Sequence, residues 1–348
     1  MKIGSCDIAA GRTPFVIAEM SGNHNGSLER ALQLVDAAAA AGAHAVKIQT
    51  YTADTMTLDI ETGEFLISDK ASLWSGKSLY QLYREAHTPW DWHPRIFERC
   101  RQRGILGFST PFDETAVDFL EGLGVPCYKI ASFENVDLNL IRKVASTGKP
   151  VIISSGLATL VEIGEAAAAA RQGGCRDLAI LKCTSSYPAE PASANLATIA
   201  NLRDAFRCEA GLSDHTMGIG VSVAAVALGA TIVEKHFTLS RTDGGVDSAF
   251  SLEPAELSRL VIECSAAAAA VGSVVYGPTE PEVASLQFRR SLYIARDVRA
   301  GEPLTRENLR AIRPGRGLPP KYLETLLGRR ATRDAVSGTP ASWDLIAS

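Results

Sequence analysis

The sequence has little of what marks disulfide-bonded, zinc-binding, membrane or nucleic-acid-binding proteins. Its seven cysteines are scattered, odd in number and without a CxxC pair, which argues against a zinc site or a disulfide framework. No uncharged run reaches the ~20 residues that span a bilayer, and the first residues lack an apolar signal core. The formal net charge of −4 gives no basic footprint for nucleic acid. We therefore expect a soluble, cytoplasmic protein with neither a membrane nor a nucleic-acid partner.

What the sequence does contain is an alternation of short apolar runs and amphipathic segments of helix length. Its 348 residues suffice for a barrel of about 250 residues plus a small appendage. Eight runs, each followed by a helix, favour an α/β fold with a closed (β/α)8 TIM barrel over an open doubly wound sheet. An open sheet usually carries a glycine-rich fingerprint after its first strand, and residues 21–26 are polar instead. The expected strands are Phe15–Met20, Ala45–Thr50, Leu106–Thr110, Cys127–Ala131, Val151–Ser155, Leu178–Lys182, Glu209–Ser213 and Ile232–His236.

Three segments depart from this repeat. Residues 51–90 form a polar and aromatic insertion with the length of a lid or substrate loop. Lys2–Ile8 is expected to form a short hairpin that plugs the barrel floor. From Gly277 the composition is typical of a linker, and a compact, turn-rich pattern follows. We therefore predict a barrel domain over residues 1–276, a linker over 277–289 and a small domain over 290–348.

Lysines and hydroxyls gather where the expected strands end. Lys47, Lys129 and Lys182 stand on apolar strands, so we expect their ammonium groups in the barrel mouth, beside the hydroxyls of neighbouring strand ends. Such a set can hold a doubly anionic, phosphorylated ligand. The alternative for any single lysine is an extended surface side chain.

Two histidines end the last two strands, His215 in Gly211-Leu-Ser-Asp-His215 and His236 in Val233-Glu-Lys-His236. At the carboxyl rim of a barrel they would lie side by side, and two neutral imidazoles there can hold a divalent metal. The other histidines of the chain are expected to be core or surface residues.

Two carboxylates are candidates for proton transfer. Glu19 ends the first strand and is the best general acid or base, because burial and neighbouring lysines can tune its pKa. Its alternative role is that of an ion-pair partner for Lys47. Asp247 lies in a loop beyond the last strand, where an ordinary turn aspartate is the alternative.

Several motifs together resemble the sialic acid synthase family. They are Ala18–Asn25, Val46–Thr52, Phe108–Asp113, Tyr128–Ser132, Gly211–His215 and Glu234–Thr238. The segment Arg289–Gly317 is similar to the C-terminal antifreeze-like (SAF) domain of that family. The resemblance covers nearly the whole chain.

The resemblance implies condensation of phosphoenolpyruvate with the open-chain aldehyde of an amino sugar. It implies Mn²⁺ or Mg²⁺ on His215 and His236, with Glu19 moving a proton and Asp247 orienting the sugar or a metal-bound water. Ser185 departs from some family members, which have an asparagine there, so its role stays open. The residues expected to bind the substrates are Asn23, Lys47, Gln49, Thr110, Phe112, Lys129, Ser132, Ser154, Ser185, Tyr187, Ser213 and Arg313.

Within the family, three segments of this chain, residues 18–25, 49–59 and 236–247, are most similar to the pseudaminic acid synthases. This branch uses 2,4-diacetamido-2,4,6-trideoxy-L-altrose. The resemblance also implies a domain-swapped homodimer, in which Arg313 of the small domain reaches the partner's site. Three alternatives remain open. In the first, the sugar is the precursor of legionaminic or neuraminic acid. In the second, the enzyme is a metal-dependent aldolase that uses pyruvate. In the third, the small domain is an ice- or carbohydrate-binding module beside an inert barrel.

Overall fold

The computed structural model, which describes residues 1–70 and 73–347, contains a closed barrel of eight parallel strands. The strand order around the barrel is β10-β3-β4-β5-β6-β7-β8-β9, so the first and last strands of the repeat pair with each other. Each predicted strand is confirmed, with both ends within one residue of the expectation. The strands are β3 (Phe15–Glu19), β4 (Ala45–Thr50), β5 (Leu106–Pro111), β6 (Tyr128–Ile130), β7 (Val151–Ser154), β8 (Leu178–Cys183), β9 (Glu209–Asp214) and β10 (Ile232–His236).

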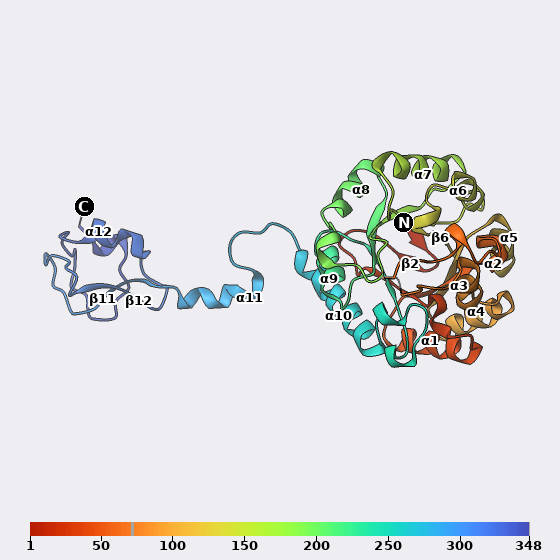
Figure 1. Ribbon diagram of the computed structural model, residues 1–348. Helices are drawn as coiled ribbons and strands as arrows, with labels where there is room; N and C mark the ends of the chain where they lie inside the picture. Colours follow the sequence, from red (N-terminus) through yellow and green to blue (C-terminus); the bar gives the residue numbers. More distant parts are fainter. Residues whose placement is uncertain (71–72, 348) are drawn as a thin grey trace. The chain divides into compact units, whose positions relative to one another are not determined.

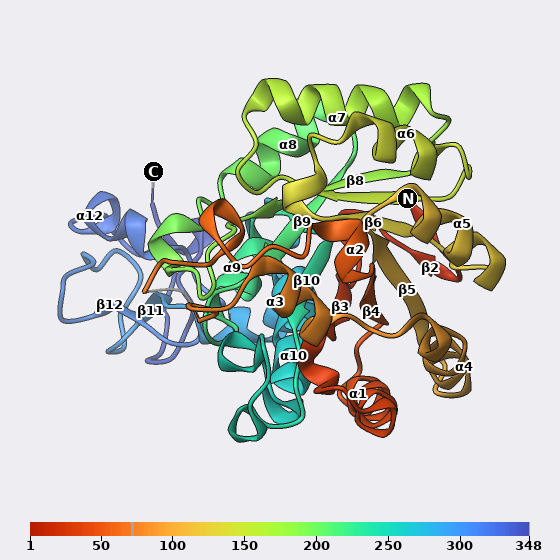
Figure 2. The ribbon, with the colours of Figure 1, turned by 45° about the vertical axis from the view of Figure 1, so that its right-hand side comes forward.

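Helices form the outer ring of the barrel (Figures 1 and 2). Several begin at a residue whose side chain accepts from the first turn, as sequence rules for helix starts require. Asp113 accepts from the amide of Ala116, and Thr159 forms a capping box with Glu162. The ring helices are α1 (Leu28–Ala40), α4 (His93–Gln102), α5 (Glu114–Leu123), α6 (Leu138–Ala145), α7 (Leu160–Gln172), α8 (Thr198–Phe206), α9 (Gly220–Ala227) and α10 (Pro254–Val271).

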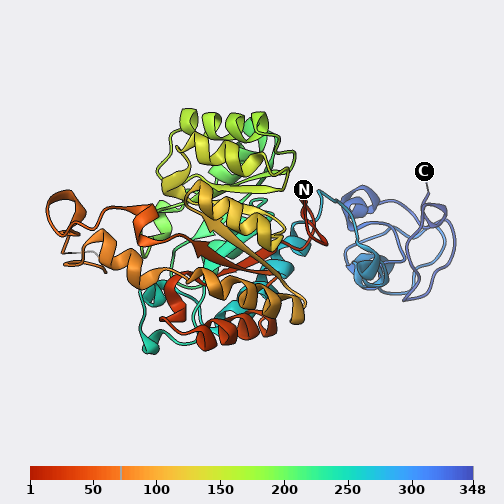
Figure 3. The same ribbon diagram turned by 90° about the vertical axis from the view of Figure 1, so that its right-hand side faces the viewer.

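The two ends of the barrel carry different additions (Figure 3). At the carboxyl end of the strands, the insertion after β4 contains α2 (Ala53–Met56) and α3 (Leu79–Ala86). Ala71 and Ser72 of the predicted insertion lie outside the described residues. At the opposite end, β1 (Lys2–Ile3) and β2 (Cys6–Asp7) pair as an antiparallel hairpin, and Ile3 and Ile8 are buried in the core. The predicted hairpin at the barrel floor is therefore confirmed.

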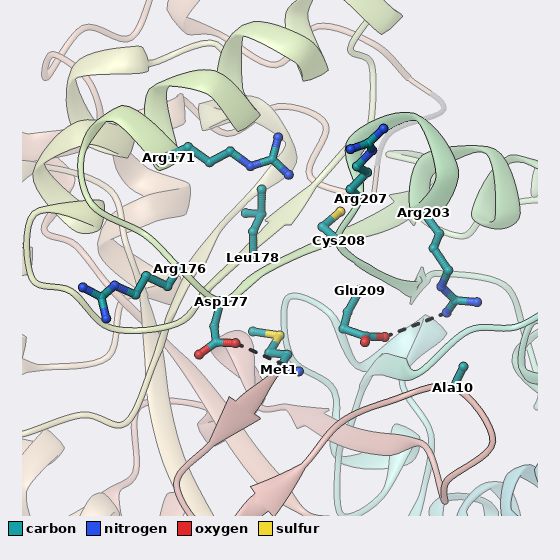
Figure 4. A pocket seen from close by; sticks show the side chains of 10 residues that line it. All are labelled: Met1, Ala10, Arg171, Arg176, Asp177, Leu178, Arg203, Arg207, Cys208 and Glu209. Carbon is teal, nitrogen blue, oxygen red and sulfur yellow. Dashed lines mark ion pairs between the residues drawn. The ribbon is translucent and has the colours of Figure 1, made fainter.

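The floor also contains an arginine-lined cavity of about 420 Å³ (Figure 4). Arg171 comes from the last turn of α7 and Arg203 from the last turn of α8. Arg176 and Arg207 come from the loops that follow these helices, and their guanidinium groups point away from each other in Figure 4. Asp177, Cys208 and Glu209 complete the polar lining.

The chain divides into two compact units, Met1–Gly272 and a second that begins at Ser273. The second unit contains α11 (Glu280–Val283), the antiparallel pair β11 (Ser291–Ile294) and β12 (Leu309–Ile312), and α12 (Leu323–Leu326). Its small core is built from side chains such as Leu292, Ile294 and Leu345. Among the described residues, no helix combines the length and the hydropathy that a bilayer crossing needs.

Candidate active site

The strand register brings polar residues of neighbouring strands together in the barrel mouth, on two successive inward levels. Glu19 of β3 pairs with Lys47 of β4 on one side and with His236 of β10 on the other. Glu234 of β10 pairs with Ser213 of β9. All five side chains are buried. Since active sites of such barrels lie at the carboxyl ends of the strands, this cluster of side chains is the candidate active site.

Lys47 is the cation on the β3–β4 side of the mouth. Its Nζ lies 2.7 Å from Oε2 of Glu19 and donates to Oγ1 of Thr110 over 3.1 Å. Burial acts to lower the pKa of Lys47, but Glu19 and Glu234 outweigh it and the pKa is raised, so the ammonium stays charged. Burial raises the pKa of Glu19, against the opposing effect of Lys47. Glu19 is thus both an ion-pair partner of Lys47 and a carboxyl suited to proton transfer.

Lys129 is the second cation, on the opposite side of Glu234. Its Nζ donates to Oγ of Ser154 over 2.6 Å, and Oε1 of Glu234 lies 3.8 Å from both lysine ammonium groups. Ser213 donates to the same oxygen over 3.1 Å. Burial would raise the pKa of Glu234, but the two lysines outweigh it, and the net shift is downward. Glu234 is therefore an ionised carboxylate that holds two buried cations beside each other.

Next to Lys129, two hydroxyl groups flank the backbone of Gly156. A Cβ at this position would lie 2.5 Å from Oγ of Ser132 and 2.2 Å from Oγ of Ser185, so glycine leaves a space that no other residue would. Together with Lys129 and Ser154, these hydroxyl groups are candidate donors to a bound anion. Such a set is suited to an anionic group such as a phosphate or a carboxylate.

Lys182 does not join the other two lysines, and its placement in the mouth was wrong. Its half-buried ammonium donates to the carbonyl of Cys183 over 2.8 Å and to Oγ1 of Thr184 over 3.3 Å. Cys183, which pairs with Ser213, occupies the inward position that Lys182 was expected to fill. Side chains alternate between the two faces of a strand, so a shift of one residue moves the side chain out of the mouth.

His215 and His236 lie together, as the sequence predicts, with ring centroids 5.3 Å apart. His215 donates from Nδ1 to the carbonyl of Thr184 over 2.9 Å, so its neutral form carries the lone pair on Nε2. Burial acts to lower the pKa of His215, but Cys183 outweighs it and the pKa is raised. Burial and the surrounding cations hold the pKa of His236 well below its usual range, so this ring is neutral. Its buried Nδ1 has no hydrogen-bond partner within the described part of the chain.

These two rings fit a divalent metal. Among the described residues, no three His, Cys, Asp or Glu side chains converge as a metal-binding group. His215 and His236 would therefore supply two ligands and leave the remaining positions to water or substrate oxygens. A site with imidazole nitrogens suits Mn²⁺ better than Mg²⁺, which prefers oxygen ligands.

Asp247 reaches the same site from the loop after β10. Its Oδ2 lies 3.9 Å from Nδ1 of His236 and accepts a short hydrogen bond from Ser21. Ser21 has a φ of 46°, a left-handed conformation that is uncommon outside glycine and costs free energy. Gln49 donates to Ser21 over 3.1 Å and to Oε1 of Glu19 over 2.9 Å, which links the two candidate acid–base carboxyls. Burial raises the pKa of Asp247.

Aromatic rings surround these polar groups. The ring of Tyr187 lies 4.5 Å from that of His215 and 5.4 Å from that of Phe250. On the other side, the ring of Phe112 lies 5.1 Å from that of Tyr51. The rim thus offers apolar surface as well as charge, which a sugar with both polar and apolar groups can use.

Of the predicted substrate-binding residues, Asn23 has a structural role beside this cluster, and Arg313 belongs to the second unit. Asn23 is buried, and its amide donates to the Phe237 carbonyl over 2.9 Å and to Oγ of Ser251 over 2.8 Å, so it ties the loops after β3 and β10 together. Arg313 follows β12 in the second unit, where it is exposed. Its role at the active site remains a prediction.

Glu134 is a buried carboxyl that the sequence analysis missed. It lies in the 3-10 turn after β6, and its Oε2 has no hydrogen-bond partner among the described residues. Burial raises its pKa to about 7, against the opposing charge of Lys129. In the sequence, Glu134 stands two residues after the predicted site residue Ser132, but no pattern there predicts that its side chain turns inward.

Known protein families match the chain in two parts, which correspond to the barrel unit and the second unit. The model of the NeuB family matches residues 34–276, and that of the SAF domain matches residues 289–347. The chain is 42% identical to a pseudaminic acid synthase of Campylobacter jejuni over 97% of each sequence. It is 35% identical to an N,N'-diacetyllegionaminic acid synthase of Legionella pneumophila, over 96% of this chain and 95% of the relative.

Among solved structures, the N-acetylneuraminic acid synthetase of Leptospira borgpetersenii is similar with a TM-score of 0.73 and 33% identity. The similarity covers 83% of this chain and 95% of that one. The barrel, its buried rim and the domain that follows it therefore place this chain in the NeuB family, with a C-terminal SAF domain.

Proposed function

We propose that this protein is a pseudaminic acid synthase. It would condense phosphoenolpyruvate with the open-chain aldehyde of 2,4-diacetamido-2,4,6-trideoxy-L-altrose, giving a nine-carbon 2-keto sugar acid and phosphate. The observation that carries the reaction type is the pair of buried lysines around Glu234, beside the His215–His236 pair. The choice of sugar is supported by the higher identity to pseudaminic acid synthases, 42%, than to legionaminic acid synthases, 35%.

The anionic substrate would occupy the donors around Lys129 and Lys47. Ser132, Ser154 and Ser185 would donate to its phosphate or carboxylate. Thr110 would hold Lys47 in place, and Ser213 would hold Glu234. Because these groups are buried and already oriented, they lose little conformational freedom when the anion binds. Until then, the charge of Glu234 favours the protonated form of both lysines, although burial outweighs it at Lys129 and lowers the pKa of that lysine.

In the reaction, C3 of phosphoenolpyruvate forms a bond to the aldehyde carbon, and the aldehyde oxygen takes up a proton. Water adds at C2, and the resulting tetrahedral carbon expels phosphate to form the 2-keto group. A divalent metal held by His215 and His236 would supply Lewis acidity toward the aldehyde oxygen. Glu19, through its raised pKa, would move a proton in sugar opening or water addition, and Asp247 would orient a sugar hydroxyl.

The test is phosphate release from phosphoenolpyruvate with each of three sugars. The first is the diacetamido-trideoxy-altrose, the second is the precursor sugar of legionaminic acid, and the third is N-acetylmannosamine. We expect the largest kcat/KM for the first. Faster turnover of another sugar would reassign the substrate, and no release with any would refute the function. Turnover of pyruvate without phosphate release would identify an aldolase.

The metal is tested by binding as well as by activity. His236→Gln should lower the affinity for Mn²⁺ about a hundredfold, which is ~3 kcal/mol, because one of two protein ligands is lost. Electron paramagnetic resonance of free Mn²⁺ measures this without substrate. His87→Gln, in the insertion, is the control and should bind Mn²⁺ as the wild type does. Equal affinity in His236→Gln would show that the metal is held elsewhere.

We further propose a homodimer in which Arg313 serves the site of the partner. Mixing an Arg313→Ala chain with a Lys129→Met chain should restore one of the two sites of each mixed dimer, since the barrel of the Arg313→Ala chain keeps Lys129 and would receive Arg313 from the Lys129→Met chain. No recovery in mixed dimers would refute the exchange.

A further inference from the structure

One of the side chains by which the insertion after β4 reaches the candidate active site is Trp74. Its indole Nε1 donates to the carbonyl of Val246 over 2.9 Å, although 172 residues separate the two in sequence. Its ring lies 5.9 Å from that of Tyr187 and is tilted by 55°. Tyr187 in turn lies 4.5 Å from the ring of His215. Trp74 therefore contacts both the loop that carries Asp247 and the aromatic ring beside the histidine pair.

Val246 can occupy its position only because residue 22 is glycine. A Cβ on Gly22 would lie 2.4 Å from Cγ2 of Val246 and 3.3 Å from the Cα and Cβ of Ala86, the last residue of α3. Contacts as short as the first do not occur, so any side chain at position 22 would displace Val246. The loop after β3, the insertion and the loop after β10 thus meet at this one point.

Other contacts hold the loop after β10 against the loop after β3. Asn25 donates to the carbonyl of Gly244 over 3.1 Å, and Arg30 pairs with Asp243 over 2.7 Å. Ser21 donates to Asp247. A displacement of Val246 would therefore change the carbonyl that Trp74 uses and the neighbouring carboxyl of Asp247 together.

We propose that Trp74 is a positioning residue for the sugar substrate, and that Gly22 and Val246 form the matched pair that sets where it binds the loop after β10. The inference rests on the proposed function and deepens it, since it assigns sugar selectivity to a contact between the insertion and the rim. Phosphoenolpyruvate would be held by Lys47 and Lys129, so its binding should not depend on Trp74.

Trp74→Phe keeps an aromatic ring near Tyr187 and removes the N–H donor together with the five-membered part of the indole. We expect the KM for the sugar to rise about fivefold, the effect of one net hydrogen bond, with the KM for phosphoenolpyruvate within twofold of the wild type. Trp90→Phe is the matched control, because Trp90 also donates from its indole to a carbonyl, that of Tyr51 over 3.2 Å, but packs on Phe119. It should leave both KM values within twofold.

Gly22→Ala tests the matched pair. It should raise the KM for the sugar at least as much as Trp74→Phe, and adding Val246→Ala should restore most of the loss, because the second change removes the clashing methyl groups. A double variant as impaired as Gly22→Ala alone would show that the loss has another cause.

Amide hydrogen exchange of residues 79–86 tests the contact without substrate. Exchange there should be about fivefold faster in Trp74→Phe and in Gly22→Ala, and should return toward the wild-type rate in the Gly22→Ala, Val246→Ala double variant. Unchanged exchange together with an unchanged KM for the sugar would overturn the proposal. If the wild type releases no phosphate with any sugar, the proposed function fails, and the exchange rates still decide whether Trp74 holds the insertion.

Discussion

The two ends of the barrel both collect charged side chains, but they use them differently. At the carboxyl rim, Lys47 and Lys129 are buried and converge on one carboxylate. At the floor, four arginines line a cavity of about 420 Å³. Arg171 and Arg203 there already donate to the carbonyls of Phe206 and Gly229. The floor has more of these cations than the rim, yet the candidate active site is at the rim.

The difference follows from the direction of the helices. In a βα barrel the helices end at the floor, where their last carbonyls carry partial negative charge and lack partners within the helix. Arg171 donates to such a carbonyl, that of Phe206 at the end of α8, and Arg203 donates to the carbonyl of Gly229 just beyond α9, so both have a structural task. At the rim, by contrast, buried atoms such as Nδ1 of His236 and Oε2 of Glu234 have no hydrogen-bond partner among the described residues. Convergence and unmet hydrogen-bonding capacity mark a site better than the number of charges does.

The largest effect should come from Lys129→Met, which removes one rim cation. We expect kcat/KM for phosphoenolpyruvate to fall about a thousandfold, or ~4 kcal/mol, because the variant loses a buried charge partner for the anion. Arg176→Met at the floor is the matched control and should stay within twofold of the wild type. Steady-state phosphate release measures both.

Lys129→Met also leaves Glu234 with one cation fewer, so a loss of activity has to be distinguished from a loss of folded protein. The Lys129→Met, Glu234→Gln variant removes both charges and should recover melting temperature without recovering activity. A Lys129→Met enzyme with kcat/KM within tenfold of the wild type would contradict the assignment of the rim.

Much of this architecture is visible in the sequence because the strands are buried on both faces. Runs such as Val151–Ser154 and Leu178–Cys183 are continuous in apolar residues, and turns or capped helices follow them, so their ends are well marked. Residues that end such strands, including Glu19 and His236, must then lie at the rim. The β3–β10 pairing that closes the barrel follows from the count of eight units.

The rest of the site depends on contacts that no local pattern encodes. Lys182 was placed in the mouth because it follows an apolar run, but an uninterrupted run does not reveal which alternate residues face inward. The contact between Trp74 and Val246 joins residues far apart in sequence, and it depends on the missing side chain of Gly22. Glu134 lies in a 3-10 turn, where no helix or strand period in the sequence tells which way the side chain points.

A smaller effect, on stability, should separate the buried carboxyl Glu134 from ordinary surface carboxyls. Burial raises its pKa from 4.5 to about 7 in the folded protein. Below pH 4.5 the group is protonated in both states and changes nothing. As the pH rises from 4.5 to 7, only the unfolded chain loses the proton, so folding is progressively disfavoured, by ~3 kcal/mol above pH 7.

Glu134→Gln removes this titration. The variant should therefore match the wild type near pH 4.5 and be more stable at pH 8, by up to ~3 kcal/mol. Urea denaturation followed by tryptophan fluorescence at several pH values gives the comparison. The same difference in unfolding free energy at pH 5 and pH 8 would mean that Glu134 does not hold its proton in the folded barrel.

The smallest effects should come from the floor. Arg207→Ala removes an exposed guanidinium and should leave kcat/KM within twofold of the wild type for both substrates. Arg203→Ala also removes the bond to the Gly229 carbonyl and the 3.9 Å ion pair with Glu209, so it should cost about 1 kcal/mol of stability and still leave kcat/KM unchanged. Phosphate release and urea denaturation of the same preparations separate the two properties. A tenfold change in kcat/KM in either variant at unchanged stability would contradict the structural role of the floor arginines, because it would require a ligand or a movement at the floor that acts on the rim across the barrel core.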